Sequence, residues 1–344
     1  MTRSRSAAIV VVAMAVLLLG AVLASALLGQ LPVTPAEVGQ TILRALGVPL
    51  PAGDPVIEGA LQVVRFPRIL LTLLVGAALA VAGVAMQAVF GNPLAEPGVV
   101  GISAGAAFGA GIAIALGLSG FGIWTTAVFA FLGALGAAAV VYLVARSQGR
   151  TEVVTLLLTG IAVNAFAGAG LALMLFLADS GSREQIVFWQ LGSMSGSRWP
   201  EVGIVAAITV ITGIGLLLQH RRYDLLALGE RGARHLGVDV ERLRVVTIVG
   251  VALLTGAAVA FCGIISFVGL VVPHLIRMMI GPGHRGLILA SAVGGALLLT
   301  VADLLARTLV TGADLPIGML TSLVGGPFFF WLLYRQRRRS GGWA

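Results

Sequence analysis

The chain has 344 residues, of which 58% are hydrophobic and only 10% are charged, with a mean hydropathy of +1.04. This composition excludes an ordinary soluble domain and indicates a polytopic α-helical membrane protein. The formal net charge of +8 at pH 7 comes from arginine alone, and the lack of any lysine excludes a Walker A nucleotide-binding loop. The single Cys262 lies in an apolar run, so it indicates neither a disulfide framework nor a zinc site.

Apolar runs of roughly 20 residues, about the length that a helix needs to cross ~30 Å of hydrocarbon, recur along the chain. The first covers residues 7–28. It contains Ala24-Ser25-Ala26, which resembles a signal-peptidase site, but the run is long for a signal peptide and we expect a retained span. Residues 31–62 are rich in proline and contain acidic residues, which predicts an aqueous segment with at most a short interfacial helix.

Nine more spans are expected downstream. They are placed at 69–90, around Gly101 to Gly109, and at 122–145, 153–178, 202–219, 245–262, 266–280, 287–304 and 315–334. The division between 262 and 266 is the least certain. With ten spans and both termini in the cytoplasm, 16 of the 22 arginines lie at cytoplasmic ends, as the positive-inside rule requires. The other six are Arg44, Arg65, Arg68, Arg183, Arg198 and Arg307. Merging 245–262 with 266–280 would instead place the basic residues at 335–339 outside.

An internal repeat is visible at an offset of 180 residues. Residues 73–83 align with 253–263, and Pro93 falls on Pro273 in the same register. The matched spans cross in opposite directions, which predicts an inverted repeat of the kind common in transporters. Its halves would cover roughly 65–178 and 245–334 of a single transmembrane domain, 1–344. Chance similarity between two Ala/Gly-rich helices is the alternative.

The most highly charged segment, 220–244, lies between these halves. Acidic and basic residues alternate there with leucines, and Gly229, Gly232 and Gly237 divide it into short pieces. We interpret it as two short cytoplasmic helices offered to a partner, with an ordinary solvated loop as the alternative.

Ionisable residues are scarce inside the predicted spans. Glu96, Asp303 and Asp314 lie at or near span ends. Proton- or sodium-coupled carriers usually keep carboxylates inside the membrane, so their scarcity argues against a secondary transporter without excluding it. A membrane enzyme has little support, because the four histidines are scattered and none has a zinc-type spacing.

Several motifs together resemble the FecCD-type permeases of ABC importers, the membrane subunits for siderophore-iron, haem and cobalamin. They are RFPRILLTLLVGAALAVAGVAMQAVFGNPLAEPGVVGISAGAAFGA (65–110), LALGERGARHLGV (226–238), GIISFVGLVVPHLIRMMIGPGHR (263–285), ADLLART (302–308) and DLPIGMLTSLVGGPFFFWLL (314–333). The resemblance covers nearly the whole chain in order. It departs at Gly283, where the family often has Asp before His-Arg.

This resemblance implies the type II ABC importer permease fold, with ten helices in the bacterial plasma (inner) membrane. It also implies a homodimer with the pathway on its two-fold axis, two cytoplasmic ATPase subunits and an external substrate-binding protein. ATP and Mg would be used by the ATPase. We therefore expect no cofactor on this chain, no enzymatic activity of its own and no nucleic-acid partner.

The resemblance also implies roles for individual residues at both ends of the spans. Arg65, Arg68 and Arg307 match arginines that grip acidic residues on the binding protein, which suits the planar fork of arginine. Headgroup anchoring is the alternative for Arg65 and Arg68. Residues expected to dock the ATPase are Leu225, Leu226, Leu228, Gly229, Glu230, Ala233, Arg234, Leu236 and Gly237.

The remaining candidates concern the translocation pathway. Asn92 and Leu94 match a cytoplasmic gate of the family, and the turn near Thr151 is expected to form a second. Met86, Gln87 and Asn164 are candidates to line the pathway, although an interhelical hydrogen bond is the more common role of a residue such as Asn164.

The sequence thus predicts a permease subunit of a binding-protein-dependent ABC importer for a chelated metal. Ferric siderophore or haem is the first expectation for the substrate, with a corrinoid next. A secondary transporter that works without ATPase subunits is the second hypothesis.

Overall fold

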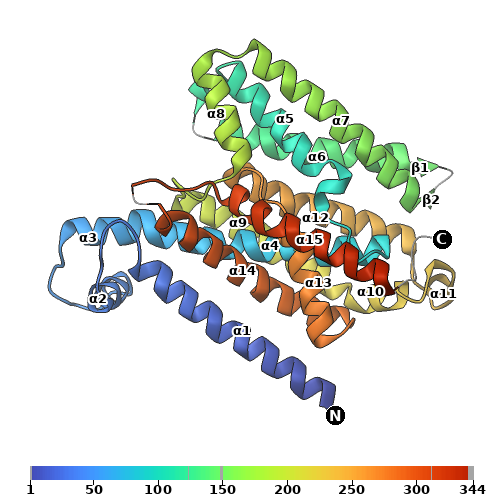
Figure 1. The fold of residues 1–344 in the computed structure, drawn as a ribbon, viewed down its shortest axis with the longest axis horizontal. Coiled ribbons are helices and arrows are strands. Elements are labelled where there is room, and N and C mark those ends of the chain that lie inside the picture. Colours follow the sequence, from blue (N-terminus) through green and yellow to red (C-terminus); the bar gives the residue numbers. More distant parts are fainter. Residues whose placement is uncertain (1, 123, 148–149, 311, 340–344) are drawn as a thin grey trace.

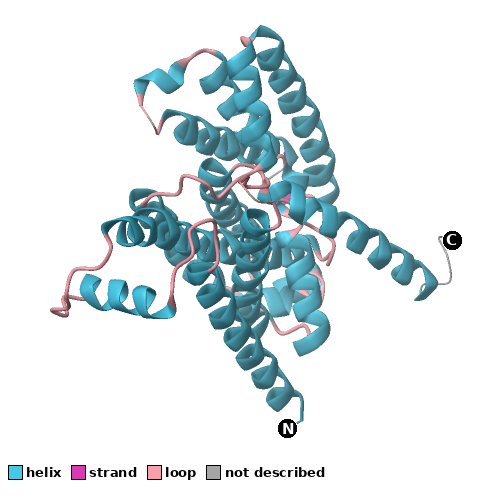
Figure 2. Cartoon of the chain, turned by 60° about the vertical axis from the view of Figure 1, so that its left-hand side comes forward, coloured by secondary structure: helices cyan, strands magenta, loops and turns pink. Residues whose placement is uncertain are grey.

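A computed structural model describes residues 2–122, 124–147, 150–310 and 312–339. Within these ranges the chain is almost entirely helical, with the loops gathered near the helix ends (Figure 2). The strands found there are the two-residue β1 (Arg146–Ser147) and β2 (Arg150–Thr151), which pair antiparallel. Seven helices are long and apolar enough to cross a membrane, and three shorter apolar helices accompany them. The expectation of about ten apolar helices is confirmed.

The ten helices occur where the apolar runs predict them. They are α1 (Thr2–Leu27), α4 (Phe66–Phe90), α5 (Ile102–Ala115), α6 (Thr125–Ala145), α7 (Val153–Leu177), α9 (Trp199–Leu218), α12 (Val240–Cys262), α13 (Val268–Ile280), α14 (His284–Thr308) and α15 (Ile317–Arg339). The least certain division is also confirmed, because α12 ends at Cys262 and α13 begins only at Val268.

Shorter elements connect these helices. They are α2 (Pro35–Ala45), α3 (Pro55–Gly59), the π-helical turn η1 (Ala60–Arg65), η2 (Pro97–Val100), η3 (Leu118–Phe121), α8 (Ser180–Leu191), α10 (His220–Leu226) and α11 (Glu230–His235). In Figure 1, α2, α3 and α8 lie toward one end of the long helices, and α10, α11 and the β1–β2 pair lie toward the other.

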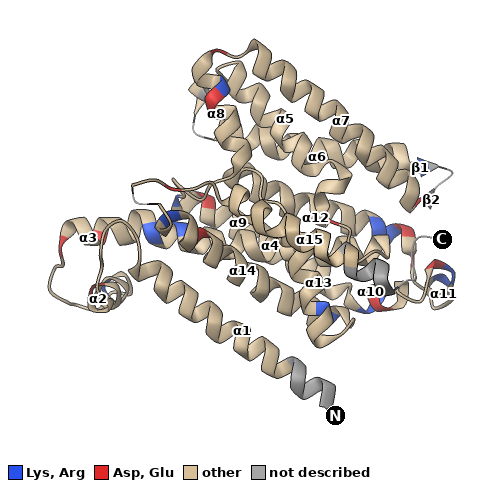
Figure 3. Ribbon diagram, in the orientation of Figure 1, with Lys and Arg blue, Asp and Glu red and all other residues tan. Residues whose placement is uncertain are grey.

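Charged residues follow the same division. Figure 3 shows Arg, Asp and Glu gathered near the two ends, with a broad uncharged middle, as a membrane-spanning protein requires. The side chains of Arg3, Arg5, Arg150 and the basic residues at 335–339 lie outside the described part of the chain. The predicted orientation of the termini therefore stays a prediction.

The segment between α1 and α4 contains more helix than the sequence predicted. Thr34 and Glu37 form a capping box that starts α2, and Asp54 accepts a hydrogen bond from Val56 N at the start of α3. Pro35 and Pro55 occupy the first helical turn, where proline favours a helix instead of ending it. From Pro55 the chain continues as helix for 36 residues to Phe90, longer than the membrane core requires. The expectation of at most a short interfacial helix was wrong, because these prolines start helices.

The predicted polar stretch between α7 and α9 contains α8. Asp179 caps this helix, accepting a 2.8 Å hydrogen bond from Ser182 N. This bond holds the pKa of the Asp179 carboxyl below its usual range.

Helix α4 lies at the centre of the bundle and packs against α9, α12, α13 and α14. Its closest contacts use glycine. A Cβ added to Gly76 would lie 2.7 Å from the carbonyl carbon of Gly295 on α14. A Cβ added to Gly83 would lie 2.6 Å from the carbonyl carbon of Gly269 on α13. Small residues let membrane helices approach to backbone contact, and these glycines serve that purpose.

The pairing of helices fits the predicted repeat. α4 packs most closely against α14, and its proposed counterpart α12 packs most closely against α6. Each half would therefore place its first helix against a helix of the other half. The boundaries of the two halves, 65–178 and 245–334, stay a prediction.

Candidate functional site

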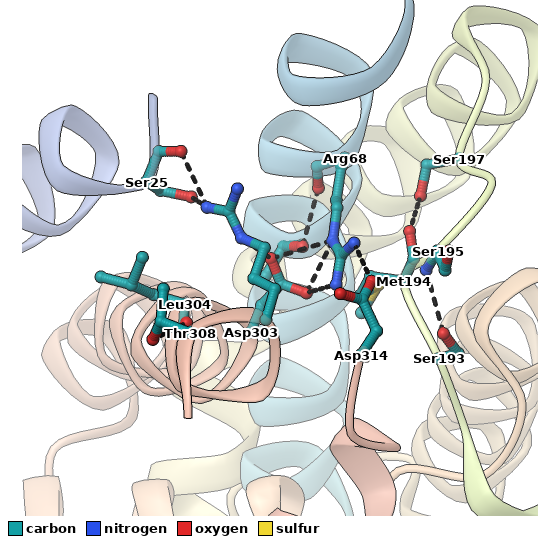
Figure 4. Close-up of polar contacts among 12 residues, drawn as sticks. Ser25, Arg68, Ser193, Met194, Ser195, Ser197, Asp303, Leu304, Thr308 and Asp314 are labelled. Carbon is teal, nitrogen blue, oxygen red and sulfur yellow. Dashed lines mark hydrogen bonds and ion pairs between the residues drawn. The ribbon is translucent and has the colours of Figure 1, made fainter. Parts of the chain in front are cut away.

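Two arginines and two aspartates form a compact ion-pair network near the end of the bundle that carries α2, α3 and α8 (Figure 4). Arg68 on α4 donates from Nε to Asp303 Oδ1 at 3.0 Å and from Nη1 to Asp314 Oδ2 at 2.6 Å. Asp303 on α14 also pairs with Arg307 one turn later, at 3.4 Å between Oδ2 and Nε. We call these four residues the arginine–aspartate network. Its formal charges cancel, which allows it to be buried.

The same end of the bundle binds the C-terminal end of α1. Arg307 donates from Nη2 to Ser25 O at 2.8 Å and to Ser25 Oγ. Arg65 donates to the carbonyl oxygen of Ala26 at 2.7 Å and to that of Leu31. Carbonyls at a helix C-terminus have no partner within the helix and carry its negative dipole end, so arginines suit them. These contacts integrate α1 into the bundle, as the retained-span prediction requires.

The three arginines that are predicted to dock a binding protein are thus buried within the chain. Arg65, Arg68 and Arg307 are only 5, 8 and 7% exposed, and all three guanidinium groups have internal partners. Carboxylates and carbonyls of this chain occupy their donors in the structure. The docking role itself stays a prediction, and it requires partner carboxylates to reach these groups.

At the opposite end, the segment 220–244 forms two short helices as predicted. α10 ends at Leu226, and α11 follows after a turn at Gly229. Gly229 and Gly237 have φ angles of +95° and +84°, a left-handed conformation that glycine adopts without steric cost. We call the part of this segment that precedes α12, residues 220–239, the coupling segment.

The coupling segment is attached to the spanning helices by buried side chains. Tyr223 is fully buried, and its hydroxyl lies 2.8 Å from Thr247 Oγ1 of α12. Burial raises the pKa of Tyr223 to about 12, so its hydroxyl stays protonated at neutral pH. Asp224 accepts a 2.9 Å hydrogen bond from His284 N at the first turn of α14. Leu226 and Ala233 are buried as well.

Two leucines of the coupling segment point away from the bundle. Leu228 is 69% exposed and Leu236 is 58% exposed. Both belong to a segment with exposed arginines, including Arg231 and Arg234. Exposed apolar groups among charges suit a surface that a partner covers.

The two predicted gate loops have different surroundings. Asn92 is exposed and its Oδ1 accepts a 2.9 Å hydrogen bond from Leu94 N, which closes a tight Asx turn. Thr151 is buried, and its N–H donates to Glu241 Oε2 of α12 at 3.0 Å. The turn between α6 and α7 is therefore held against the start of α12. The coupling segment ends at the same place.

Comparison with known proteins identifies the family of this chain. The model of the FecCD transport family matches residues 16–335. The chain belongs to the FecCD transport family. It is 44% identical over 282 residues to the hemin transport system permease protein HmuU of Yersinia pestis, covering 81% of this chain and 84% of that protein.

Two further proteins are similar to this FecCD permease over almost its whole length. The alignment with the cobalamin import system permease protein BtuC of Halobacterium salinarum is 360 positions long, is 38% identical and covers 94% of this chain and 95% of that protein. A solved structure described as an inward-facing conformation of a metal-chelate type ABC transporter superposes with a TM-score of 0.82 at 32% identity. This match covers 94% of the present chain and 98% of the other. The type II importer fold expected from the sequence fits this likeness.

The predicted pathway residues of the FecCD permease lie among packed helices. Met86 and Gln87 are almost completely buried between α4 and its neighbours. Gln87 Nε2 donates to Leu270 O at 3.4 Å, and Gln87 Oε1 accepts from Arg277 Nη2 at 3.1 Å. Both side chains are thus enclosed within the single chain, and a role in lining the pathway stays a prediction. Asn164 is half-buried and donates to Gly98 O at 3.2 Å, the interhelical bond considered as its alternative.

Sequence reasoning missed the partners of the functional arginines in this FecCD permease. Asp303 and Arg307 are four residues apart on one helix, a spacing that could have predicted their ion pair. No comparable signal joins Arg68 to Asp303, which lie 235 residues apart, or Arg244 to Thr151, which lie 93 apart.

Proposed function

We propose that this FecCD permease is the translocation subunit of a binding-protein-dependent ABC importer in the bacterial inner membrane. The observation that carries the proposal is the coupling segment. It is attached to α12 and α14 through Tyr223 and Asp224, yet it presents Leu228 and Leu236 to a partner. A rigidly held, partly apolar surface suits an ATPase subunit, which the chain needs because it has no lysine for a Walker A loop.

We infer the remaining architecture from the resemblance. Two copies of the chain form a homodimer with the pathway between them and one ATPase on each coupling segment. Both chain termini then lie in the cytoplasm, on the side of α10 and α11. The binding protein docks at the opposite end, where carboxylates of its lobes approach Arg65, Arg68 and Arg307. Asp314 is the most exposed member of the arginine–aspartate network and is the carboxylate that a partner would displace first.

Removing the exposed leucines tests the ATPase surface. We expect Leu228→Asp with Leu236→Asp to reduce the ATPase recovered with the tagged chain from its native membrane by at least about tenfold, because two apolar contacts become desolvated charges. Mass spectrometry of the purified complex measures the ratio. Leu46→Asp alters an equally exposed leucine at the opposite end and should leave the ratio unchanged. Recovery of the original chain alone and intact would instead favour a secondary transporter.

The substrate is proposed to be a chelated metal, with haem or a ferric siderophore first and a corrinoid next. The relatives named as a hemin permease and as a cobalamin permease are 44 and 38% identical, which supports a chelated-metal substrate, and the order within this class rests on the sequence resemblance. We expect proteoliposomes containing the chain, its ATPase and its binding protein to accumulate haem or a ferric siderophore when ATP is supplied. Competition with unlabelled haem, ferric siderophore and cobalamin identifies the class. Inhibition by cobalamin alone would reverse the order.

A further inference from the structure

Arg244 is the most deeply buried arginine of the described chain, at 1% exposed, and it lies on the second turn of α12. Its two terminal nitrogens reach two different elements. Nη1 donates to the backbone carbonyl of Thr151, in the turn between α6 and α7, and Nη2 pairs with the carboxylate of Glu230 at the start of α11. A single guanidinium therefore joins the coupling segment to the turn predicted as a gate.

The turn is also held from a second side by α12. Glu241 lies three residues before Arg244, and its carboxylate accepts from both the N–H and the hydroxyl of Thr151. Tyr142 at the end of α6 donates its hydroxyl to the same carboxylate at 3.2 Å. The amide N–H, hydroxyl and carbonyl of Thr151 are thus all bound to Glu241 and Arg244, so the turn must follow any displacement of the first turns of α12.

The other end of this connection lies at the surface of the chain. Glu230 is the first residue of α11 and is half-exposed, unlike Arg244. Gly229 and Gly237 flank α11 with positive φ angles, so the short helix can pivot about two glycines while Glu230 remains paired. Glu230 also pairs with Arg234 at 3.2 Å, which lies one turn further along the exposed face of α11. A force applied to α11 by a partner is therefore applied to the carboxylate that Arg244 holds.

We propose that Arg244 transmits the motion of the coupling segment to the gate turn at Thr151, acting as a positioning residue between Glu230 and the Thr151 carbonyl. The inference rests on the proposed function, in which an ATPase moves the coupling segment. The planar fork of arginine reaches two partners from separate nitrogens in set directions, whereas all three donors of a lysine ammonium are on one nitrogen. Because the pair with Glu230 reaches into the buried interior, its loss frees the turn from α11 without removing the surface that docks the ATPase.

Transport measured against ATP hydrolysis tests the proposal in proteoliposomes containing the full complex. We expect Arg244→Lys and Glu230→Gln each to lower the substrate transported per ATP hydrolysed by at least about fivefold. Arg244 lies outside the residues expected to dock the ATPase, so Arg244→Lys should also maintain the rate of hydrolysis. Glu230→Gln alters a half-exposed side chain and serves if the Arg244 variant fails to fold. Arg285→Gln, an exposed arginine at the same end of the bundle on α14, is the matched control and should leave the ratio unchanged. An unchanged ratio in both test variants would overturn the proposal.

A second measurement needs no ATPase and separates this inference from the proposed function. Spin labels are attached at Leu236→Cys in the coupling segment and at Glu152→Cys beside the gate turn, and the distance between the two labels is measured in the isolated chain. The native Cys262 is buried and should not be labelled. We expect a narrow distance distribution with Arg244 and a clearly broader one with Arg244→Lys or Glu230→Gln. Equal widths would show that Arg244 does not connect the two elements. If the complex transports nothing with ATP while the widths still differ, the proposed function fails and the connection stands.

Discussion

Asp303→Asn is expected to destabilise the chain strongly, lowering the midpoint of thermal unfolding in detergent by on the order of 10 °C. Asp303 is almost completely buried and is the one carboxylate in the arginine–aspartate network that pairs with both Arg68 and Arg307. Removing its charge leaves two buried guanidinium groups with too little negative charge, and breaking a buried ion pair costs about 3–5 kcal/mol. Tryptophan fluorescence or a thiol-independent dye assay measures the midpoint.

Asp314→Asn provides the matched comparison. Asp314 is partly exposed and pairs with Arg68 at 2.6 Å, but Arg68 keeps Asp303 when Asp314 is neutralised. Its variant is expected to lose much less stability, because water screens the remaining charge. Equal losses of thermal stability in the two variants would show that Asp303 is not the main stabilising carboxylate of the network.

Gly83→Val is expected to abolish recovery of monodisperse protein. A Cβ at this position would overlap the carbonyl oxygen of Gly269 and lie 2.7 Å from its Cα, so the clash is with backbone and no rotamer relieves it. α4 and α13 would have to separate, and overpacking of a close-packed interior costs typically about 1–3 kcal/mol or more. Size-exclusion chromatography of a fluorescent fusion measures the recovery.

Gly20→Ala is the control for this clash. Gly20 lies on α1, and a Cβ there would meet nothing within 4 Å. Its recovery should match that of the original chain. Normal recovery of Gly83→Val would show that α4 and α13 are not held in backbone contact.

The positions of the spanning helices were predictable because hydrophobic run length is a local property of the sequence. The short helix α11 between Gly229 and Gly237 followed from a local signal as well, whereas the break between α12 and α13 was supported by the positive-inside rule. The helices α2 and α3 were missed because proline ends a helix in its interior but favours its first turn, and composition alone does not distinguish the two.

The surroundings of individual side chains were less predictable because they depend on how each helix is rotated within the bundle. Arg68 had a predicted docking role but no predicted partner within the chain, and the rotation of α4 turns it toward Asp303 of α14. The same rotation buries Met86 and Gln87. Arg244 drew no attention in the sequence, since its partners Thr151 and Glu230 become neighbours only when α6, α11 and α12 assemble.

The glycine contacts of α4 have a consequence for movement during a transport cycle. Gly83 rests on Gly269 of α13, and Gly76 rests on Gly295 of α14, without side chains between the backbones. Side chains can change rotamer to let two helices slide, but touching backbones have no such freedom. α4, α13 and α14 are therefore expected to shift together as one rigid body. A hinge between this body and α12 would lie in the non-helical chain between Gly263 and Phe267, where the left-handed Phe267 (φ +69°) begins the turn into α13.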